Sequence, residues 1–341
     1  MADTLFTANL LVSTWGRELF REAEDFIYFK RFMGTSENSI IQVKNELNGK
    51  EGQDVTFGLI MKLGGAGVTG DATLEGNEEA ITTYSMIVEI DQVRNACRSR
   101  GRLHDRSHYY DFRTNAKNLL KIWLAELVDQ DIFNTLSATP TRALGEDAAG
   151  VYRFDATYKT ALATGDVATT KGIDILWKLA QEPYNAGELV MRPINVDGVG
   201  HYVLILSGEA LYDMKQDATW AQGHREARER GKDNPIFRGS DYLWSGVVVH
   251  QHKQITSFIN GGPGTDVRGS LNLFLGAQAG VYAKADEPIW VEKRFDYDNK
   301  TGVAGGIIYG FEKSVFASGV AAANEDFATM IYCTSNTRLR A

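Results

Sequence analysis

Apolar residues recur every three or four positions in three stretches of the chain, which is the spacing of a helix with one buried face. The first predicted helix covers about residues 14–33, after a lead of about a dozen residues that could form an extended arm. The longest predicted helix runs from Tyr110 to about Ser137. A third covers Lys171 to Gln181, where Thr169 or Thr170 is expected to cap the first turn.

Two stretches rich in β-branched residues predict long strands at 54–63 and 80–91. A segment of glycines and acidic residues, 64–79, joins them. Strands of about ten residues at roughly 3.3 Å each make a hairpin about 30 Å long. A hairpin of that length is unlikely to bury both faces against a domain of this size, so we expect it to project from the body.

Further strands are predicted where short apolar runs alternate with turn residues. They cover 201–206, 242–249, 271–275, 280–282, 289–295, 307–316 and 329–334. A short helix is expected at 207–214, directly after the first of these strands. The polar stretch 139–168 has little periodicity and is predicted to be an insertion or a surface loop. Helices and strands together indicate an α+β fold.

Composition narrows the class of protein. The chain has 341 residues, of which 43% are hydrophobic, enough for a real core in one or two lobes. Its apolar runs are far shorter than the roughly 20 residues of a membrane span, so no membrane partner is expected. Lys plus Arg number 36 and Asp plus Glu 44, a net charge of 36 − 44 = −8, which argues against broad binding of nucleic-acid phosphates. Two cysteines suggest synthesis in a reducing cytoplasm.

One glycine motif matches the sequence of a dinucleotide-binding fingerprint but not its structural context. Gly65, Gly67 and Gly70 stand in the G-x-G-x-x-G spacing after a predicted strand. In a dinucleotide site, such glycines open a helix that receives the pyrophosphate. Here the residues that follow lack a helical stripe and lead into another strand. The motif is therefore interpreted as a glycine-rich hairpin tip, and no cofactor site is predicted.

Two histidine pairs and one acidic loop were weighed as metal sites. His104 and His108 have helical spacing, but Asp105 stands where a zinc protease has glutamate. His250 and His252 share one strand face without an acidic or cysteine partner. Both pairs are interpreted as surface or interface histidines.

The segment 296–302 resembles a calcium loop, but Lys300 stands at a ligand position. It is predicted to be a β-turn. No catalytic, cofactor-binding or metal site is therefore predicted, and the chain is not expected to be an enzyme.

A basic run leaves two interpretations open. Its arginines are Arg94, Arg98, Arg100, Arg102 and Arg106. They could contact a polynucleotide backbone, helped by tyrosines nearby. Alternatively they could meet acidic segments of a neighbouring chain, such as 71–79, because the arginine fork binds carboxylates bidentately. The net negative charge favours contact between subunits, where we place Arg98, Arg100, Arg102 and Arg106.

The arm and the hairpin are extensions that one chain cannot readily bury, because isolated two-stranded hairpins are only marginally stable. Other copies of the chain would cover them, which predicts an assembly of one subunit type. The hairpin residues expected to pack on a neighbour are Phe57, Leu59, Met61, Tyr84, Met86 and Val88. Phe57→Asp is accordingly expected to leave a soluble subunit that cannot assemble.

The order of these parts resembles the tailed-phage major capsid proteins of the HK97 fold, in particular the coliphage N4-like branch. Gly64 and Gly65 at the hairpin tip carry part of the resemblance. The rest lies in the ordered segments 171–181, 202–206, 244–248, 273–280, 290–292, 296–302, 306–313 and at Phe316. Each motif is short, and their joint order is specific.

The resemblance implies a division of the chain into four regions. Residues 1–45 would be an N-terminal arm, and 46–93 the extended β-hairpin called the E-loop, lying on an adjacent subunit. Residues 94–167 and 286–341 would form the peripheral P-domain around a spine helix at 110–137. Residues 168–285 would form an α/β A-domain. The 139–168 stretch is longer than a minimal version of this fold requires.

The resemblance also implies the function and the partners. Copies would assemble as hexamers and pentamers into an icosahedral shell around double-stranded DNA, in the host cytoplasm, with only weak or local DNA contact. Because no long charged helical segment precedes the arm, a separate scaffolding protein is expected. A portal protein at one vertex and a decoration protein are further expected partners. The alternatives are a nanocompartment (encapsulin-like) shell of the same fold and, more distantly, a metal- or nucleotide-dependent enzyme.

Overall fold

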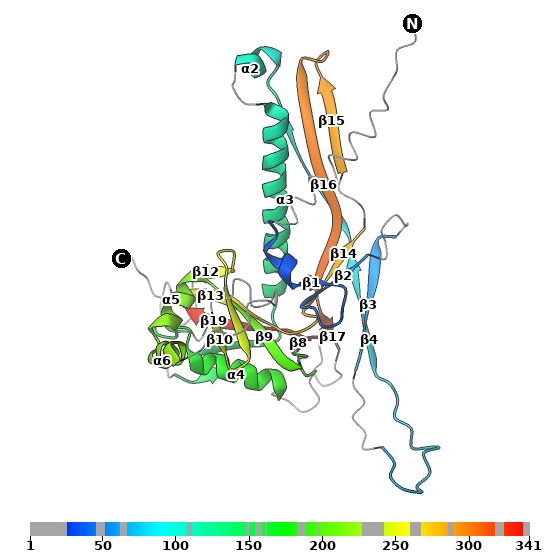
Figure 1. Cartoon of the computed structure of the whole chain (residues 1–341), viewed down its shortest axis with the longest axis vertical. Coiled ribbons are helices and arrows are strands. Elements are labelled where there is room, and N and C mark those ends of the chain that lie inside the picture. Colours follow the sequence, from blue (N-terminus) through cyan, green and yellow to red (C-terminus); the bar gives the residue numbers. More distant parts are fainter. Residues whose placement is uncertain are drawn as a thin grey trace.

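The structure is a computed structural model of the whole chain. It describes residues 26–45, 52–61, 67–107, 111–146, 150–153, 159–160, 162–182, 189–196, 198–226, 242–259, 267–285, 289–317 and 324–336. The molecule is elongated, with an upright helix and sheet above a wider lobe and a hairpin that projects from the lower end (Figure 1).

The long helix and the strands behind it form the upright part. Helix α3 (Phe112–Ser137) begins at Asp111, whose carboxylate accepts a hydrogen bond of 3.1 Å from the Thr114 backbone N–H. Its sheet has the order β1-β2-β14-β16-β15, with β5 also paired to β16. The strands are β1 (Met33–Gly34), β2 (Ile41–Lys44), β5 (Asp91–Arg98), β14 (Gly280–Lys284), β15 (Ile289–Phe295) and β16 (Lys300–Lys313).

Helix α3 packs along β16 through apolar side chains at two levels. Ala116 and Leu120 meet Trp290 and Val303 near the upper end. Lower down, Leu124, Val128 and Phe133 join the main core. The Arg113 Nε atom donates a 2.8 Å hydrogen bond to Glu292, which fixes the helix on β15.

The lobe is built on a nine-stranded sheet with the order β10-β11-β9-β13-β19-β6-β7, to which β8 and β12 are added. Its strands are β6 (Ala143–Glu146), β7 (Tyr152–Arg153), β8 (Ile194–Val196), β9 (Val199–Leu206), β10 (Tyr242–Trp244), β11 (Val247–Gln251), β12 (Ser257–Ile259), β13 (Arg268–Leu275) and β19 (Thr329–Ser335). The central strands are buried along nearly their whole length, as expected for a sheet that is covered on both faces.

Helices α4 (Thr170–Gln181), α5 (Gly208–Gln216) and α6 (Ala218–Glu226) surround this sheet (Figure 1). Helix α4 is capped by Thr169, whose hydroxyl accepts from the Gly172 N–H, so the predicted cap is confirmed. Its stripe of Ile173, Leu176 and Ala180 is fully buried.

The predicted hairpin is present as a separate two-stranded sheet of β3 (Asp54–Ile60) and β4 (Thr83–Glu89). The two strands pair antiparallel, with Asp54 opposite Glu89 and Ile60 opposite Thr83. Beyond these strands the segment 67–82 continues downward away from the body (Figure 1).

Three local predictions are wrong. The stretch 139–168 is not only an insertion or loop, because β6 within it is a buried strand that pairs parallel to β19. Four residues are too few to show a period. Where the predicted first helix enters the described residues, the chain forms the 3-10 helix η1 (Tyr28–Phe32) and then β1; residues 14–25 lie outside them. Strand β16 begins at Lys300, within the predicted turn between β15 and its partner strand.

The two sheets do not follow the boundaries of the four expected regions. Strands β6, β7 and β19 lie outside 168–285 in the sequence and yet belong to the nine-stranded sheet. Strand β14 lies inside that range and belongs to the upright sheet. The chain therefore crosses between the two sheets several times, and the boundary between them is a region of contact rather than a linker.

Candidate functional site

The base of the hairpin is fixed to the chain's own core. Strand β3 alternates strictly, with Val55, Phe57 and Leu59 buried and the residues between them exposed. The Phe57 ring lies 6.0 Å from the ring of Phe316, which follows β16 in strand β17 (Val315–Phe316). This alternation is that of a strand with one covered face.

Two more contacts hold the same base. The Tyr84 ring of β4 lies 6.1 Å from Phe316, and Phe316 meets Phe327 at 5.9 Å. The Arg192 guanidinium lies over the Phe327 ring and donates a hydrogen bond to the backbone carbonyl of Ile60. We call the set Phe57, Tyr84, Phe316, Phe327 and Arg192 the hairpin root.

The structure places the six hairpin residues predicted to pack on a neighbour on the covered face. Phe57, Leu59 and Val88 are at most 1% exposed within the single chain, so they are core residues of their own subunit. Met61, Tyr84 and Met86 are partly buried against the same core. Phe57→Asp would bury a carboxylate in that core. The variant is therefore expected to destabilise the subunit itself, which corrects the expectation that only assembly is lost.

The free face of the hairpin carries apolar residues that the sequence analysis did not select. Ile60, Ile81 and Ile87 are 63%, 67% and 58% exposed, and Leu74 near the tip is 60% exposed. The alternation of residues along β3 and β4 distinguishes the two faces of the hairpin. Because a strand has two faces, choosing the wrong one exchanges every inward residue for an outward one.

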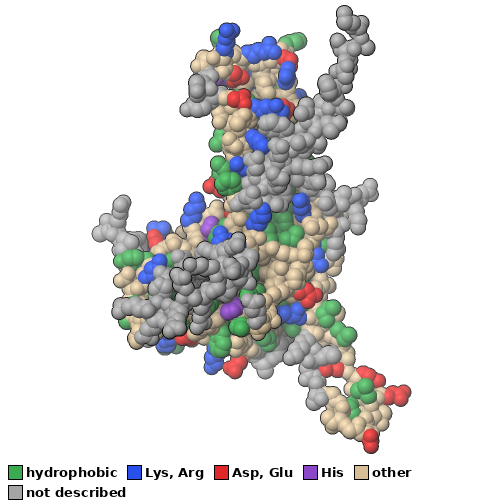
Figure 2. Space-filling view, viewed as in Figure 1, with side chains coloured by type: hydrophobic (Ala, Val, Ile, Leu, Met, Phe, Trp, Pro, Cys, Tyr) green, Lys and Arg blue, Asp and Glu red, His purple; other side chains and the backbone are tan. Residues whose placement is uncertain are grey.

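The hairpin tip is acidic. Asp71, Glu75, Glu78 and Glu79 are all exposed in the segment between β3 and β4. They gather at the lower end of the molecule in Figure 2. Of the glycine motif, Gly67 and Gly70 have φ near +67°, which suits a chain that turns repeatedly rather than opening a helix. Gly65 lies outside the described residues.

The arginine end lies at the opposite end of the chain. Arg98, Arg100, Arg102 and Arg106 are all exposed, at the end of β5 and on helix α2 (Arg102–Ser107). Figure 1 places α2 at the top of the molecule and the hairpin tip at the bottom, and Figure 2 shows the basic side chains gathered at the top. One subunit therefore cannot bring its own arginine end to its own acidic tip.

The turn between β15 and β16 completes the arginine end. Asp296, Tyr297 and Asp298 have φ of 55°, 47° and 68°, three successive left-handed residues, and Tyr297 is fully exposed. Asn299 accepts a hydrogen bond of 3.3 Å from the Arg102 backbone N–H, which joins the turn to α2. The turn predicted at 296–302 is present over residues 296–299, where the Asn299 N–H donates to the Asp296 carbonyl, and it ends where β16 begins. Among the described residues, no group of three or more His, Cys, Asp or Glu side chains is arranged to hold a metal ion.

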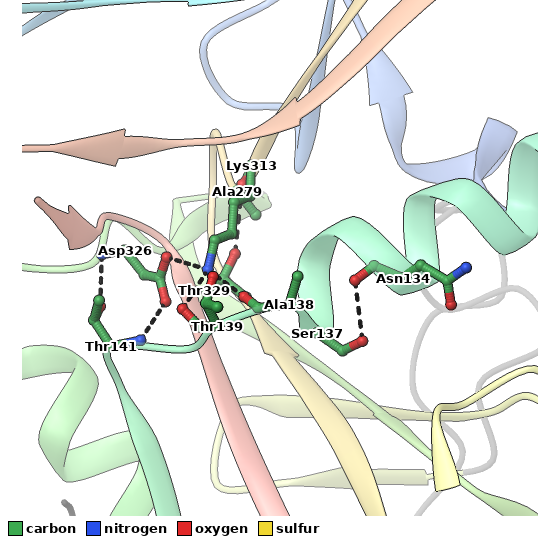
Figure 3. Close-up of polar contacts among 9 residues, drawn as sticks. All are labelled: Asn134, Ser137, Ala138, Thr139, Thr141, Ala279, Lys313, Asp326 and Thr329. Atoms are coloured by element: carbon green, nitrogen blue, oxygen red, sulfur yellow. Dashed lines mark hydrogen bonds and ion pairs between the residues drawn. The ribbon is translucent and has the colours of Figure 1, made fainter. Parts of the chain in front are cut away.

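A buried polar cluster joins the upright sheet to the lobe (Figure 3). At the end of β16, the Lys313 Nζ atom lies 2.7 Å from Asp326 in strand β18 (Glu325–Asp326). It also donates to the backbone carbonyls of Ala138 and Thr139, just beyond α3, at 2.7 and 3.1 Å. Asp326 in turn accepts from the Thr141 N–H at 2.8 Å. This junction ties the spine helix, the upright sheet and the lobe together at one buried charge pair.

The arm is anchored on the lower half of α3. The Asp129 carboxylate accepts hydrogen bonds from the backbone N–H groups of Tyr28 and Phe29, at 2.8 and 3.3 Å. Burial raises the pKa of Asp129 to about 6. The His252 ring stacks on Phe133 and lies 4.2 Å from the Tyr28 ring. Burial, followed by the charges of Lys253 and Arg31, lowers the pKa of His252 to about 4.

Within the described residues, His250 and His252 do not belong to a group of three or more potential metal ligands. His250 is fully buried with its ring 5.3 Å from Phe32, so its interpretation as a surface histidine is wrong. His252 lies against Tyr28 and Phe133, where the arm packs on α3. His104 is exposed on α2, and His108 lies outside the described residues. Within the described residues, no helix is both long enough and apolar enough to span a membrane.

An elongated subunit with a projecting hairpin, opposite charges at its two ends and a spine helix on a twisted sheet is the geometry of a building block. Residues 5–335 match the family described as phage capsid protein. The chain belongs to the phage capsid protein family. It is 32% identical over 339 residues, covering 90% of both chains, to the major capsid protein of Pseudomonas phage KPP25.

Solved capsid structures agree with this membership. The capsid protein of Ralstonia phage GP4 is 28% identical and superposes with a TM-score of 0.76, covering 92% of both chains. The Cyanophage Pam1 capsid protein has a TM-score of 0.73 at 20% identity, covering 98% of this chain and 94% of that one. The chain has the HK97-type fold and is a structural major capsid protein of the tailed-phage class, not an enzyme.

Proposed function

We propose that copies of this chain assemble as hexamers and pentamers into an icosahedral shell around the double-stranded DNA of a tailed phage of the N4-like branch. Within the shell, the acidic hairpin tip of one subunit contacts the arginine end of the next. The observation that carries this proposal is the difference in charge between the two ends of one elongated chain (Figure 2). Acidic side chains gather at the hairpin tip, whereas basic side chains gather at the other end with several acidic ones among them. A contact between unlike ends repeats from subunit to subunit and closes into rings.

Charge complementarity supports the pairing of ends. Arg98, Arg100, Arg102 and Arg106 supply four exposed guanidinium groups, and Asp71, Glu75, Glu78 and Glu79 supply four exposed carboxylates. Arginine forms bidentate hydrogen bonds with carboxylates, which adds geometric specificity to attraction. Tyr297 and Leu103 at one end and Leu74 at the other are exposed apolar residues that would lie within such a contact. Interfaces of this type combine an apolar centre with a charged rim.

Charge reversal tests the pairing. Arg100→Glu/Arg106→Glu is expected to abolish shells, because carboxylates would then face carboxylates. Asp71→Arg/Glu75→Arg is expected to do the same. A single chain that carries all four substitutions is expected to recover shells, since unlike charges then face each other again at the substituted positions. Negative-stain microscopy and sedimentation velocity measure the result. Lys178→Glu, an exposed reversal on α4, is the matched control and should assemble normally.

The chain with all four substitutions decides the proposal. Shells from either double variant alone would overturn the pairing of the two ends, as would failure of the fourfold variant to form shells when circular dichroism shows that it is folded. Absence of shells from the unchanged chain under every condition, including addition of the phage's own scaffolding protein, would overturn the shell function itself.

The regions of the fold have proposed roles in this shell. Residues 1–45 act as the arm, 46–93 as the E-loop, 94–167 and 286–341 as the P-domain, and 168–285 as the A-domain around the symmetry axes. Met61, Tyr84 and Met86 would add contact with a neighbour at the edge of the hairpin root. The exposed Ile60, Ile81 and Ile87 are better placed for this contact than the buried Phe57, Leu59 and Val88.

The proposed partners are a separate scaffolding protein during assembly, a portal protein at one vertex and a decoration protein. Assembly takes place in the host cytoplasm. The DNA is held only by weak or local contact, because a chain with a net charge of −8 repels phosphate over most of its surface. Tight, salt-sensitive binding of duplex DNA by the free subunit, measured by fluorescence anisotropy, would contradict this part of the proposal.

A further inference from the structure

A groove opens beside the spine helix, between α3 and the strands β5 and β16. It has a volume of about 690 Å³. Its walls combine aromatic and acidic side chains from the three elements and from the hairpin root side of β4. The lining residues that matter for recognition are Glu89, Trp123, Glu126, Asp131, Tyr309 and Phe311.

The floor of the groove is aromatic and rigid. Tyr309 and Phe311 project from β16 with 5% and 7% of their surface exposed. Their neighbours on that strand are fixed by pairing to β5 on one side and β14 on the other. The Tyr309 hydroxyl donates a 3.0 Å hydrogen bond to Asp131 of α3. Trp123, about two helical turns before Asp131 on α3, is partly exposed and completes an apolar surface suited to a flat or cationic group.

The rim is negative. Glu89, Asp91 and Glu126 are exposed carboxylates around this floor, and none of the described lining residues is Lys or Arg. Glu312 lies close enough for its pKa to be raised by burial and then by the negative charges of Asp131 and Glu89. Negative charges that repel one another around an aromatic floor are complementary to a cation.

Part of the free edge of the strand beside the groove is occupied by local hydrogen bonds. Among the described strands β5 pairs only with β16. The Ser99 N–H bonds to β16, so the N–H groups of Gln92 and Ala96 face the free edge. Each of these two already donates to the side chain of the preceding residue, at 2.7 and 2.8 Å. These two groups are therefore less available for a new backbone ladder, which favours recognition by the side chains of the groove.

We propose that this groove binds a cationic segment of a different protein, with an arginine side chain stacked on Trp123 and paired to Glu126 and Glu89. Arginine fits because its guanidinium both stacks on aromatic rings and forms bidentate hydrogen bonds with carboxylates. The segment is assigned to a different protein because the proposed function pairs this chain's own arginine end with the acidic hairpin tip. The binding itself requires no shell and is measurable on the isolated subunit.

The test uses a hexa-arginine peptide with blocked ends and the tryptophan fluorescence of the full chain. Saturable quenching is expected, and Trp123→Phe should remove it, because Trp123 is the reporter in the groove. Glu89→Gln/Glu126→Gln is expected to weaken binding about tenfold or more, the effect of losing charge-assisted contacts. The matched control, Glu37→Gln/Glu182→Gln, removes two exposed carboxylates outside both the groove and the hairpin tip and should leave the affinity unchanged.

Three results would overturn the proposal. The first is quenching that survives Trp123→Phe unchanged, which would place the peptide elsewhere. The second is equal weakening by the two double variants, which would show general attraction to a negative chain. The third is quenching that rises with protein concentration in the absence of peptide and disappears in Arg100→Glu/Arg106→Glu. That result would assign the groove to the arginine end of a second copy.

Discussion

Individual buried charges in this subunit lie where parts of the chain meet, and the arm anchor is a clear example. Asp129 binds the arm with a carboxylate whose pKa is raised to about 6 from 3.8. Its contribution to the free energy of unfolding is therefore full below pH 3.8 and is lost as pH rises through 6. His252 has its pKa lowered to about 4 from 6.5, so its contribution is full above pH 6.5 and is lost as pH falls toward 4. The two effects oppose each other.

Removing either side chain should therefore reveal the pH dependence of stability that the other side chain causes. Asp129→Asn is expected to make the free subunit less stable as pH falls from 6.5 to 4, with a slope approaching about 1.4 kcal/mol per pH unit. His252→Phe is expected to make it more stable as pH falls from 6 to 4. Urea unfolding across this pH range measures both. Parallel pH profiles for the two variants would show that neither residue titrates as described.

The buried Lys313–Asp326 pair, which joins the upright sheet to the lobe, gives a second prediction about single residues. Lys313→Met would leave the buried Asp326 carboxylate without its cation, which should lower the free energy of unfolding by about 3–5 kcal/mol. Adding Asp326→Asn should recover much of the loss, because the amide oxygen still accepts from Thr141 and carries no charge. Lys300→Met is the matched control. It removes an exposed partner of Asp296 and should cost less than about 1 kcal/mol.

At the scale of elements, the hairpin separates stability from assembly through its two faces. Phe57→Ala should lower the free energy of unfolding by about 3–5 kcal/mol, because it opens a cavity in the root. Ile87→Ala, on the free face, should change it by less than about 0.5 kcal/mol and yet reduce the yield of shells. Denaturant unfolding and sedimentation measure the two properties. A large loss of stability with Ile87→Ala would reverse the assignment of the faces.

The sequence was sufficient for the long elements and insufficient for the choice of face. The spine helix was predicted to within two residues of its observed bounds, because 26 residues repeat the helical period many times. The hairpin was predicted from its β-branched strands. Which face of it is covered depends on Phe316 and Phe327, more than two hundred residues away, and no local pattern contains that information. Strand β6 escaped notice for a related reason, since only its pairing with β19 defines it.

The candidate contact residues show the same limit. The arginines were found because a run of like charge is visible in one dimension. The groove at Trp123 and Tyr309 draws its residues from β4, β5, α3 and β16 and from Gln254, so only folding brings its aromatic floor and acidic rim together. Its separate members look ordinary in the sequence.

At the scale of the whole molecule, the charge separation predicts how assembly depends on salt. Raising the ionic strength from about 0.01 M to about 1 M shortens the screening length from about 30 Å to about 3 Å. The initial rate of assembly, followed by light scattering, should fall steeply over this range. The chain that carries Arg100→Glu, Arg106→Glu, Asp71→Arg and Glu75→Arg together should show the same dependence. A rate that does not respond to salt would contradict association through the charged ends.

In the proposed shell, the hairpin root would also influence the shape of the particle. A hairpin fixed to its own subunit at the root and in contact with a neighbour at the tip would act as a lever arm, so a small tilt at Phe316 would become a large displacement at Glu75. The angle between successive subunits, and with it the curvature of the wall, would then depend on Phe316 and Phe327, which lie far from the hairpin tip. Substitutions there would alter particle diameter while leaving every touching residue unchanged.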